Sequence, residues 1–238
     1  MTARLLVVLA AAITAGCGAV PGNDNDIDFA SGGVLIPAAR ASVDLSRSAA
    51  APSEPHTGHA IEVEVTGANA SDTQPVGATP IALGGQVFSA PQELRGDSSF
   101  RFGQVAYRYR KFFGANQAFG IELLAGIAHS QLDLTLTGAS QSANARFSDN
   151  GVAGGVGGIW RFRQATSLQA RYLVFLAANS AAYRLDLQVV QALGAHAALR
   201  GGLATWFVDV QGDQRGSTAP PDIGVRFWGP TLGVDVLF

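Results

Sequence analysis

The sequence contains very little cysteine and little charge. Cys17 is the one cysteine among 238 residues, so the chain cannot form an internal disulfide, and an oxidising compartment would add no cross-link to it. Charged residues make up only 14% of the chain, whereas a soluble domain normally carries about a quarter. The net charge of −2 and the lack of a basic run argue against nucleic acid as a partner.

Long apolar runs are also missing, although 47% of the residues are hydrophobic. Beyond residue 16 no apolar run approaches the length of about 18 residues that a transmembrane helix needs. High hydrophobicity dispersed through short alternating segments is typical of a transmembrane β-barrel, because each strand needs only one apolar face.

The first residues have the pattern of an export leader. A basic residue precedes the apolar run 5–13, which is too short to span a membrane but suits a signal peptide. The run ends in Thr-Ala-Gly-Cys at 14–17, which resembles a lipobox, where cleavage before Cys17 leads to its lipidation. Ordinary cleavage near Gly16 or Ala19 is the alternative. We expect a signal peptide over residues 1–16 and lipidation of Cys17.

Residues 17–58 lack sustained periodicity and are rich in Ala, Ser, Pro, Asp and Asn. This composition predicts a disordered periplasmic tether. The acidic segment 24–28 begins like a calcium loop, but Phe29 stands where such a loop needs glycine and Leu35 where it needs glutamate. We interpret it as a solvated part of the tether and predict no metal site and no cofactor.

From residue 59 onward, apolar residues alternate with small or polar ones, as in strands with one apolar face. The pattern predicts eight strands. Short connections at 113–116, 163–166 and 193–195 alternate with longer ones at 68–98, 135–147 and 211–221, the asymmetry of turns and loops in an outer-membrane barrel. The short link near Asn179 is an exception to this alternation. The predicted strands are about 59–67, 99–111, 117–134, 148–163, 166–177, 181–193, 195–210 and 222–238, the last with a register change near Gly229-Pro230.

The chain ends on a strand of strict alternation, in which Leu232, Val234, Val236 and Phe238 share one face. This ending resembles the carboxy-terminal strand of bacterial outer-membrane barrels, whose final aromatic residue is read by the barrel insertion machinery. Phe238 is therefore the expected assembly signal.

With its strand count and loop asymmetry, the region 59–238 resembles small eight-stranded outer-membrane β-barrel proteins of the OmpA transmembrane-domain, OmpX and OmpW type. The resemblance implies an all-β, antiparallel, up-and-down transmembrane β-barrel in the outer membrane of a Gram-negative bacterium. It also implies outer-membrane lipid as the surroundings, a monomeric state, and an N-terminus that lies with Phe238 on the periplasmic side.

The inward positions of the predicted strands carry charges of both signs. The interior of an eight-stranded barrel is just wide enough for side chains, so charges there have to be paired. Near balance of sign favours a plug of salt bridges over an ion-selective pore, with a ligand or proton path as the alternative. The best predicted pair is Glu122 with Arg108. The predicted network comprises Glu62, Glu64, Arg108, Arg110, Glu122, Arg161, Arg171, Arg184, Asp186, Arg200 and Asp235.

The histidines do not indicate an enzyme. His129 and Ser130 are adjacent, so on a strand their side chains point to opposite faces, and the His-x-Ser-Asn pattern of outer-membrane deacylases is missing. His56 and His59 lie in or beside the tether, and no two histidines share a strand face with a carboxylate in a metal-binding spacing. We therefore predict no catalytic residues, with a lipid-modifying enzyme as a less favoured alternative.

The expected function is structural or interactive, through envelope integrity or surface contact by the outer loops. A second hypothesis is OmpW-like passage of small hydrophobic molecules, for which the inward apolar candidates are Leu173, Phe175, Trp206 and Val208. A soluble lipocalin-like barrel, with the apolar parity turned inward, is the remaining alternative.

Overall fold

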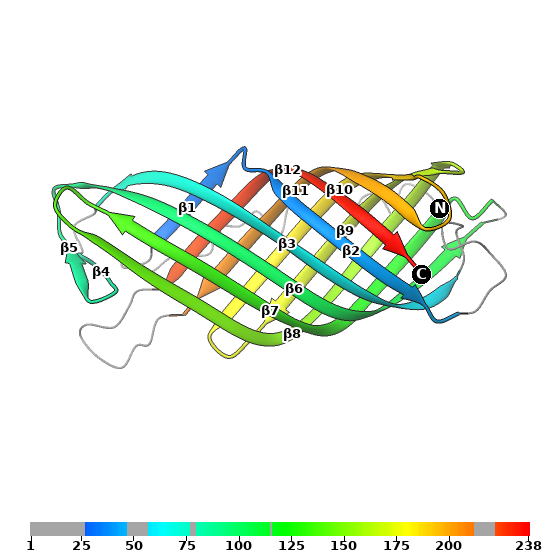
Figure 1. Ribbon diagram of the computed structural model, residues 1–238, viewed down its shortest axis with the longest axis horizontal. Helices are drawn as coiled ribbons and strands as arrows, with labels where there is room; N and C mark the ends of the chain where they lie inside the picture. The colour runs from blue at the N-terminus through cyan, green and yellow to red at the C-terminus, as the bar shows by residue number, and fades with distance from the viewer. Residues whose placement is uncertain (1–26, 47–56, 77–79, 115, 212–221) are drawn as a thin grey trace.

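The computed structural model describes residues 27–46, 57–76, 80–114, 116–211 and 222–238 (Figure 1). This described part is built of strands joined by turns, and none of it forms a helix able to cross a bilayer. The strands are β1 Ile27–Gly32, β2 Ile36–Asp44, β3 Gly58–Pro75, β4 Ile81–Leu83, β5 Gln86–Phe88, β6 Glu93–Phe113, β7 Phe119–Thr137, β8 Ser142–Arg163, β9 Thr166–Leu176, β10 Ser180–Ala192, β11 Ala197–Val210 and β12 Ile223–Leu237.

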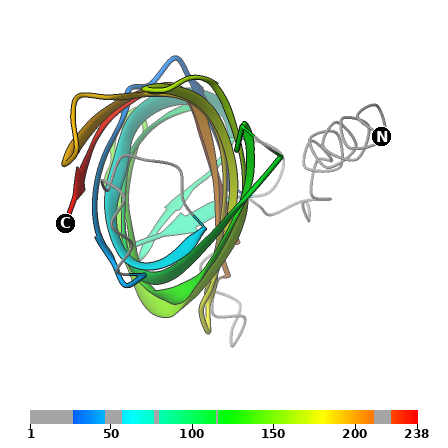
Figure 2. The ribbon, with the colours of Figure 1, turned by 90° about the vertical axis from the view of Figure 1, so that its right-hand side faces the viewer.

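Nine of these strands form one closed ring, seen end-on in Figure 2. Its order is β2, β3, β6, β7, β8, β9, β10, β11 and β12, and β12 pairs again with β2. Neighbours are antiparallel except at this closing pair, where β2 runs parallel to β12, and β1 continues the same edge in parallel. The all-β prediction is confirmed, whereas the predicted number of eight strands is wrong.

The additional strand comes from the region predicted to be a tether. That prediction is wrong for residues 27–44, because β1 and β2 lie there. On β2 the inward residues are Ile36, Ala38, Arg40 and Ser42, and the outward residues include Pro37 and Ala39. The two faces differ too little in hydrophobicity to show as alternation in the sequence. Residues 1–26 and 47–56, with the predicted leader and Cys17, lie outside the described residues.

The closing edge is interrupted between β1 and β2. Gly32 pairs with Trp228, but Ile36 pairs with Thr231, so one extra residue is accommodated on this edge, while β12 stays in register with β11. A Cβ on Gly229 would lie 2.1 Å from the carbonyl oxygen of Val34. Any other residue would clash there, so this close approach of two backbones requires glycine. A register change was predicted near Gly229-Pro230 of the last strand. It lies opposite these two residues, in the segment between β1 and β2, and not in β12 itself.

The two ends of the ring differ. Short connections β6–β7, β8–β9 and β10–β11 lie at the end where β12 reaches Phe238, which we call the Phe238 end. The β4–β5 hairpin lies at the opposite, hairpin end (Figure 1). Because β1 and β2 run parallel to β12, the chain enters the ring at the hairpin end. The expectation that the first strand begins at the same end as Phe238 is therefore wrong: with an odd number of strands, the last strand ends opposite to where the first begins. The N-terminus itself lies outside the described residues.

The strands are staggered and unequal in length. We start at Asp44 and step from each residue to its Cα partner on the next strand. One full turn of the ring does not return to Asp44 but arrives at Ser31, farther back along the same edge. This stagger tilts the strands against the ring axis, as Figure 1 shows. With 21, 19 and 22 residues, β6, β7 and β8 extend past their neighbours. The predicted loops 68–98 and 135–147 are therefore mostly strand.

Candidate functional site

The outer face of the ring carries large apolar side chains on every strand. These side chains are exposed although their residues belong to regular, fully paired strands. A protein that is monomeric in water rarely exposes so large a continuous apolar surface. We call this surface the apolar band; one member from each strand of the ring is Val43, Val63, Val105, Leu123, Val156, Tyr172, Leu187, Leu203 and Val234.

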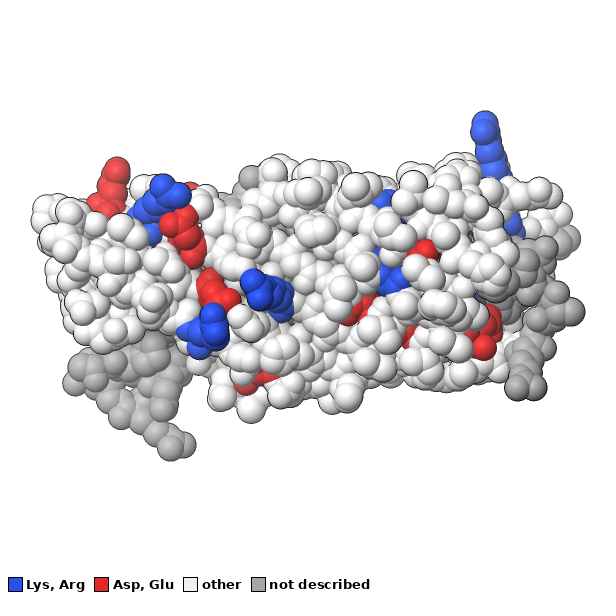
Figure 3. Space-filling model, viewed as in Figure 1, with Lys and Arg blue, Asp and Glu red and all other residues white. Residues whose placement is uncertain are grey.

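The band ends abruptly on β3, β6, β7 and β8. Val63, Val105, Ile127 and Val152 are Cα partners in one row across these strands, and their exposed fractions range from 42% to 68%. Beyond this row, toward the hairpin end, Val65 is the last large apolar residue on the outer face of these strands, and the outward residues after it are small, polar or charged. Figure 3 shows charged side chains at this end of the molecule and at the opposite end, with a stretch free of charge between them. The outward polar residues include Asn69, Ser71, Asp97, Ser99, Arg101, Gln131, Asp133, Arg146 and Ser148.

The inner face of the same strands changes in the opposite sense. On the Phe238 side the inward residues are charged or polar, as in Glu62, Glu64 and Gln104. Farther on they are apolar, as in Phe100 and Leu132, which are almost completely buried. The wall is therefore apolar outside and polar inside at the Phe238 end, and polar outside and apolar inside beyond it. We call the latter region, residues 65–75, 93–103, 129–137 and 142–150, the extension.

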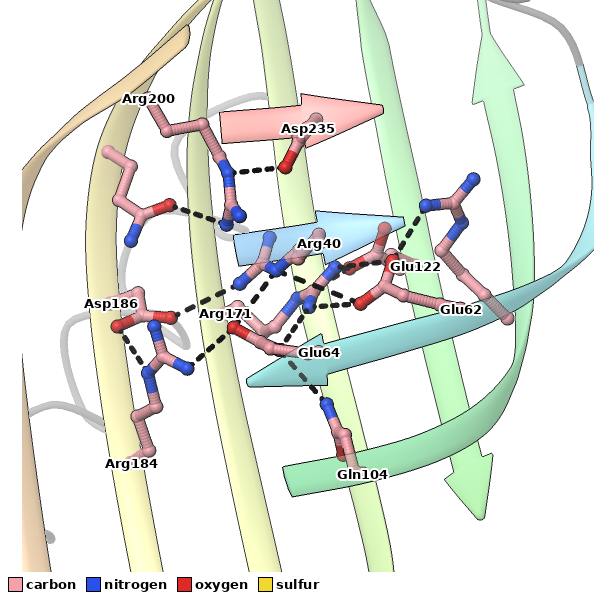
Figure 4. A network of polar contacts seen from close by, with 12 residues as sticks. Arg40, Glu62, Glu64, Gln104, Glu122, Arg171, Arg184, Asp186, Arg200 and Asp235 are labelled. Carbon is pink, nitrogen blue, oxygen red and sulfur yellow. Dashed lines mark hydrogen bonds and ion pairs between the residues drawn. The ribbon is translucent and has the colours of Figure 1, made fainter. Parts of the chain in front are cut away.

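The polar interior is organised around two buried glutamates of β3 (Figure 4). Glu62 binds Nη1 of Arg108 at 2.6 Å and Nη1 of Arg171 at 2.7 Å. These partners lie on β6 and β9, on opposite walls of the ring. Since the carboxylate has no exposed surface, these charge-assisted hydrogen bonds replace its lost hydration.

Glu64 forms a second centre, one inward position along β3. Its Oε1 lies 2.7 Å from Nη1 of Arg184 and 3.0 Å from Nε of Arg40, and its Oε2 accepts a hydrogen bond from Nε2 of Gln104 at 3.0 Å. Nε of Arg184 in turn binds Asp186 at 2.7 Å. Arg40 thus occupies the middle of the network. It lies on β2, the strand that the sequence did not predict, because β2 shows no clear alternation of apolar and polar residues.

Glu122 joins the network to the wall of β6 and β7. Its Oε2 lies 2.6 Å from Nε of Arg110, its direct register partner, and its Oε1 lies 2.6 Å from Nη2 of Arg171. The predicted pair of Glu122 with Arg108 is wrong, because the register opposes Arg108 to Leu124 and places Arg110 beside the carboxylate.

Two further predicted residues lie at the side of the network. Nε of Arg200 binds Asp235 at 2.7 Å, and its Nη1 donates to Oε1 of Gln188 at 3.3 Å. Arg161 lies at the Phe238 end, where its Nη2 donates to the carbonyl oxygen of Gln164 at 2.8 Å. Arg161 makes no ion pair with a carboxylate of the described residues.

An aromatic layer fills the interior next to the charges. Trp206 is fully buried and lies with its ring centroid 5.0 Å from that of Phe100 and 4.9 Å from that of Phe102. The guanidinium of Arg184 lies 5.3 Å from the Trp206 ring, so a cation–π contact joins the two layers. The candidates for hydrophobic passage, Leu173, Phe175, Trp206 and Val208, are all packed into this layer.

The β4–β5 hairpin covers the apolar layer at the hairpin end. Leu83 and Phe88 are buried in the same cluster as Leu134 and Leu136 of β7. The hairpin is held to the next turn by a hydrogen bond of 2.6 Å from Nε2 of Gln141 to the carbonyl oxygen of Val87. The interior is therefore filled in two layers, one of charges and one of apolar side chains.

The histidines do not assemble a catalytic arrangement with serine. His129 is outward, with Nδ1 3.0 Å from Oδ1 of Asn150, whereas Ser130 is buried on the inner face. His59 contacts the hydroxyl of Tyr107, and Nδ1 of His196 lies 3.1 Å from the carbonyl oxygen of Leu237. His56 lies outside the described residues. Within the described ranges no group of three His, Cys, Asp or Glu side chains could hold a metal ion.

Comparisons of the chain with protein-family models, with curated proteins and with solved structures give no match.

Proposed function

We propose that this chain is an outer-membrane β-barrel protein of nine strands, with a structural or interactive role and no enzymatic one. The observation that carries the proposal is the apolar band, which surrounds the ring and ends in one register row on four neighbouring strands. A bilayer is the medium that an apolar outer surface of this extent requires, and a closed ring leaves no unpaired strand edge within it.

The connections support one orientation. Outer-membrane barrels have short turns on the periplasmic side and longer loops outside. Three of the four connections at the Phe238 end are short, the exception being the link between β2 and β3, whereas β3–β6 and β11–β12 at the hairpin end are long. The Phe238 end is therefore periplasmic in our proposal. The extension and the β4–β5 hairpin then stand outside the cell, where the polar outer face of β6, β7 and β8 meets water or the saccharide of the outer leaflet. The chain enters β1 from this outer side.

The filled interior supports a role in contact rather than in transport. Ion pairs cross the ring between β3 and β9, and the aromatic layer closes the remaining length. We propose that the extension presents a surface to partners outside the cell, on a rigid, monomeric base held in outer-membrane lipid after delivery by the barrel insertion machinery.

The decisive test is the migration of membrane-extracted protein on SDS gels, unboiled against boiled, together with conductance in planar bilayers. We expect faster migration of the unboiled protein and no stable open channel. A protein that dissolves without detergent and shows no heat shift would contradict the membrane assignment.

Hydrophobic passage can be tested in cells that produce the wild-type protein, the variant Trp206→Arg or neither. Uptake of a hydrophobic probe that depends on the wild-type protein and is lost in Trp206→Arg would replace the proposed role with transport. Uptake that is equal in cells with and without the protein agrees with the filled interior.

A further inference from the structure

The mouth of the ring at the Phe238 end contains a cavity of about 110 Å³. Three arginines of the inner wall, Arg108, Arg110 and Arg161, line it together with Ser167 and Gln169. A space of this size admits a few water molecules and is smaller than a drug-sized pocket. It therefore suits a compact group such as a phosphate or a carboxylate.

The arginines keep donors available toward this cavity. Arg108 uses Nη1 for Glu62, Arg110 uses Nε for Glu122, and Arg161 uses Nη2 for a backbone carbonyl. A guanidinium has five N–H donors, so these contacts leave most of them for other acceptors. The carboxylates in the lining, Asp44 and Asp235, already have partners.

The charged side chains behind the cavity also include more positive than negative groups. Inward arginines outnumber inward carboxylates in the described part of the network, and the guanidiniums of Arg40 and Arg200 lie near each other (Figure 4). Nη2 of Arg200 is buried and has no hydrogen-bond partner among the described residues. A buried donor without an acceptor is costly, so negative charge near this region stabilises the network.

We propose that this mouth is a binding site for a compact oxyanion, a phosphate or carboxylate group held by Arg108, Arg110 and Arg161. Guanidinium groups bind such anions through paired, parallel N–H···O bonds, which a single ammonium group cannot make. Arg108 and Arg110 are two residues apart on β6 and share its inner face, while Arg161 approaches from β8. The site requires only the folded ring, so it does not depend on the proposed membrane location.

The test is isothermal titration of refolded protein in detergent with inorganic phosphate, at constant ionic strength. Wild-type protein should bind phosphate in the millimolar range or tighter. Arg161→Gln should lower the affinity about tenfold or more, the effect of losing one charge-assisted hydrogen bond. Arg161→Lys should lower it less. Arg163→Gln is the matched control, because Arg163 is exposed on the same strand end and does not line the cavity.

A second arm identifies the source of the oxyanion. In a buffer without inorganic phosphate, protein in nanodiscs of zwitterionic phosphatidylcholine is compared by thermal unfolding with protein in nanodiscs that also contain anionic phosphatidylglycerol. Stabilisation by the anionic lipid that is lost in Arg161→Gln would support the site and assign the group to a lipid headgroup.

No binding by wild-type protein in either arm would overturn the proposal, and so would equal loss of affinity in Arg161→Gln and Arg163→Gln. The heat shift on gels is measured on each variant. It reports ring closure independently of anion binding, so failure of the site is distinguishable from failure of the barrel.

Discussion

The Phe238 end of the ring and the extension are inside-out versions of each other. On β6, Val105 is outward and Arg108 inward at the Phe238 end, whereas Asp97 is outward and Phe100 inward in the extension. Both regions have a single apolar face, which meets the proposed lipid at the Phe238 end and the protein's own core in the extension. In our proposal a single strand therefore crosses two media, and the polarity of its two faces is exchanged where the medium changes.

The two regions also fill the interior of the ring in different ways, one with charged side chains and the other with apolar ones. Polar filling requires that every buried charge has a partner, because a single missing partner leaves an uncompensated ion. Apolar filling requires only volume and shape, and loss of a side chain leaves a cavity whose neighbours relax incompletely. The two regions should therefore respond differently to substitutions of similar size.

The largest effect should follow from breaking the polar filling at its centre. Glu62→Gln keeps the shape of the side chain but leaves Arg108 and Arg171 without their shared carboxylate, which should lower the free energy of unfolding by about 3–5 kcal/mol. Urea unfolding in lipid vesicles, followed by tryptophan fluorescence, measures the loss. Glu93→Gln, at an exposed position of β6, is the control, and equal stability of the two variants would contradict the role of the network.

Breaking the apolar filling should cost somewhat less. Trp206→Ala removes a fully buried ring from the cluster with Phe100 and Phe102, and we expect a loss of about 3 kcal/mol. Trp228→Ala, on the neighbouring strand with half of its side chain exposed, is the matched control with a smaller expected loss. Unfolding is followed by the heat shift on gels, and equal losses at the two positions would contradict the packed aromatic layer.

The boundary between the two regions can be located with arginine on the outer face of β7. Leu123→Arg places a charge in the middle of the apolar band and should cost about 2–3 kcal/mol, whereas Thr135→Arg, on the same face of the extension, should cost under about 1 kcal/mol. The comparison is made by urea unfolding in vesicles. If both substitutions are tolerated equally, the band does not face lipid.

The smallest effect should come from acid acting on the outer face of the extension. A hydrogen bond from Ser71, and Arg95 beside it, hold the pKa of Asp97 below its usual value, and a hydrogen bond from Arg146 does the same for the pKa of Asp133. A lowered folded-state pKa stabilises the protein above the unfolded value of about 3.9, and this contribution is lost as pH falls through the folded-state value. Because both groups are partly exposed, we expect only about 0.3 kcal/mol from each.

The measurement for this effect is the stability of wild type and Asp97→Asn between pH 6 and pH 3. The difference between them should shrink as pH falls. A difference that grows on acidification would contradict the assigned sign of the shift.

Alternation in the sequence predicted eight of the nine strands of the ring and the outward direction of the residues of the band. It could not show β2, whose inner face holds Ala38 and Arg40 and whose outer face holds Pro37 and Ala39. It also ended β3 too early, because residues beyond Val65 reverse their alternation and so read as a polar loop. The members of the charge network other than Arg40 could be named from parity, but their pairing depended on a register that sequence spacing does not fix.

The bonds that close the ring also determine when it can close. Thr231 donates its hydroxyl proton to the carbonyl oxygen of Ile36 over 2.8 Å, across almost the whole length of the chain. Contacts between residues so far apart in sequence form late, because the loop that they close costs the most entropy. The antiparallel pairs from β2–β3 to β11–β12 can each form from neighbouring segments, but the other edge of β2 has to wait for the last strand to be synthesised. Until then, the incomplete sheet has two free edges, and assembly of this protein therefore ends with the meeting of its earliest and latest strands.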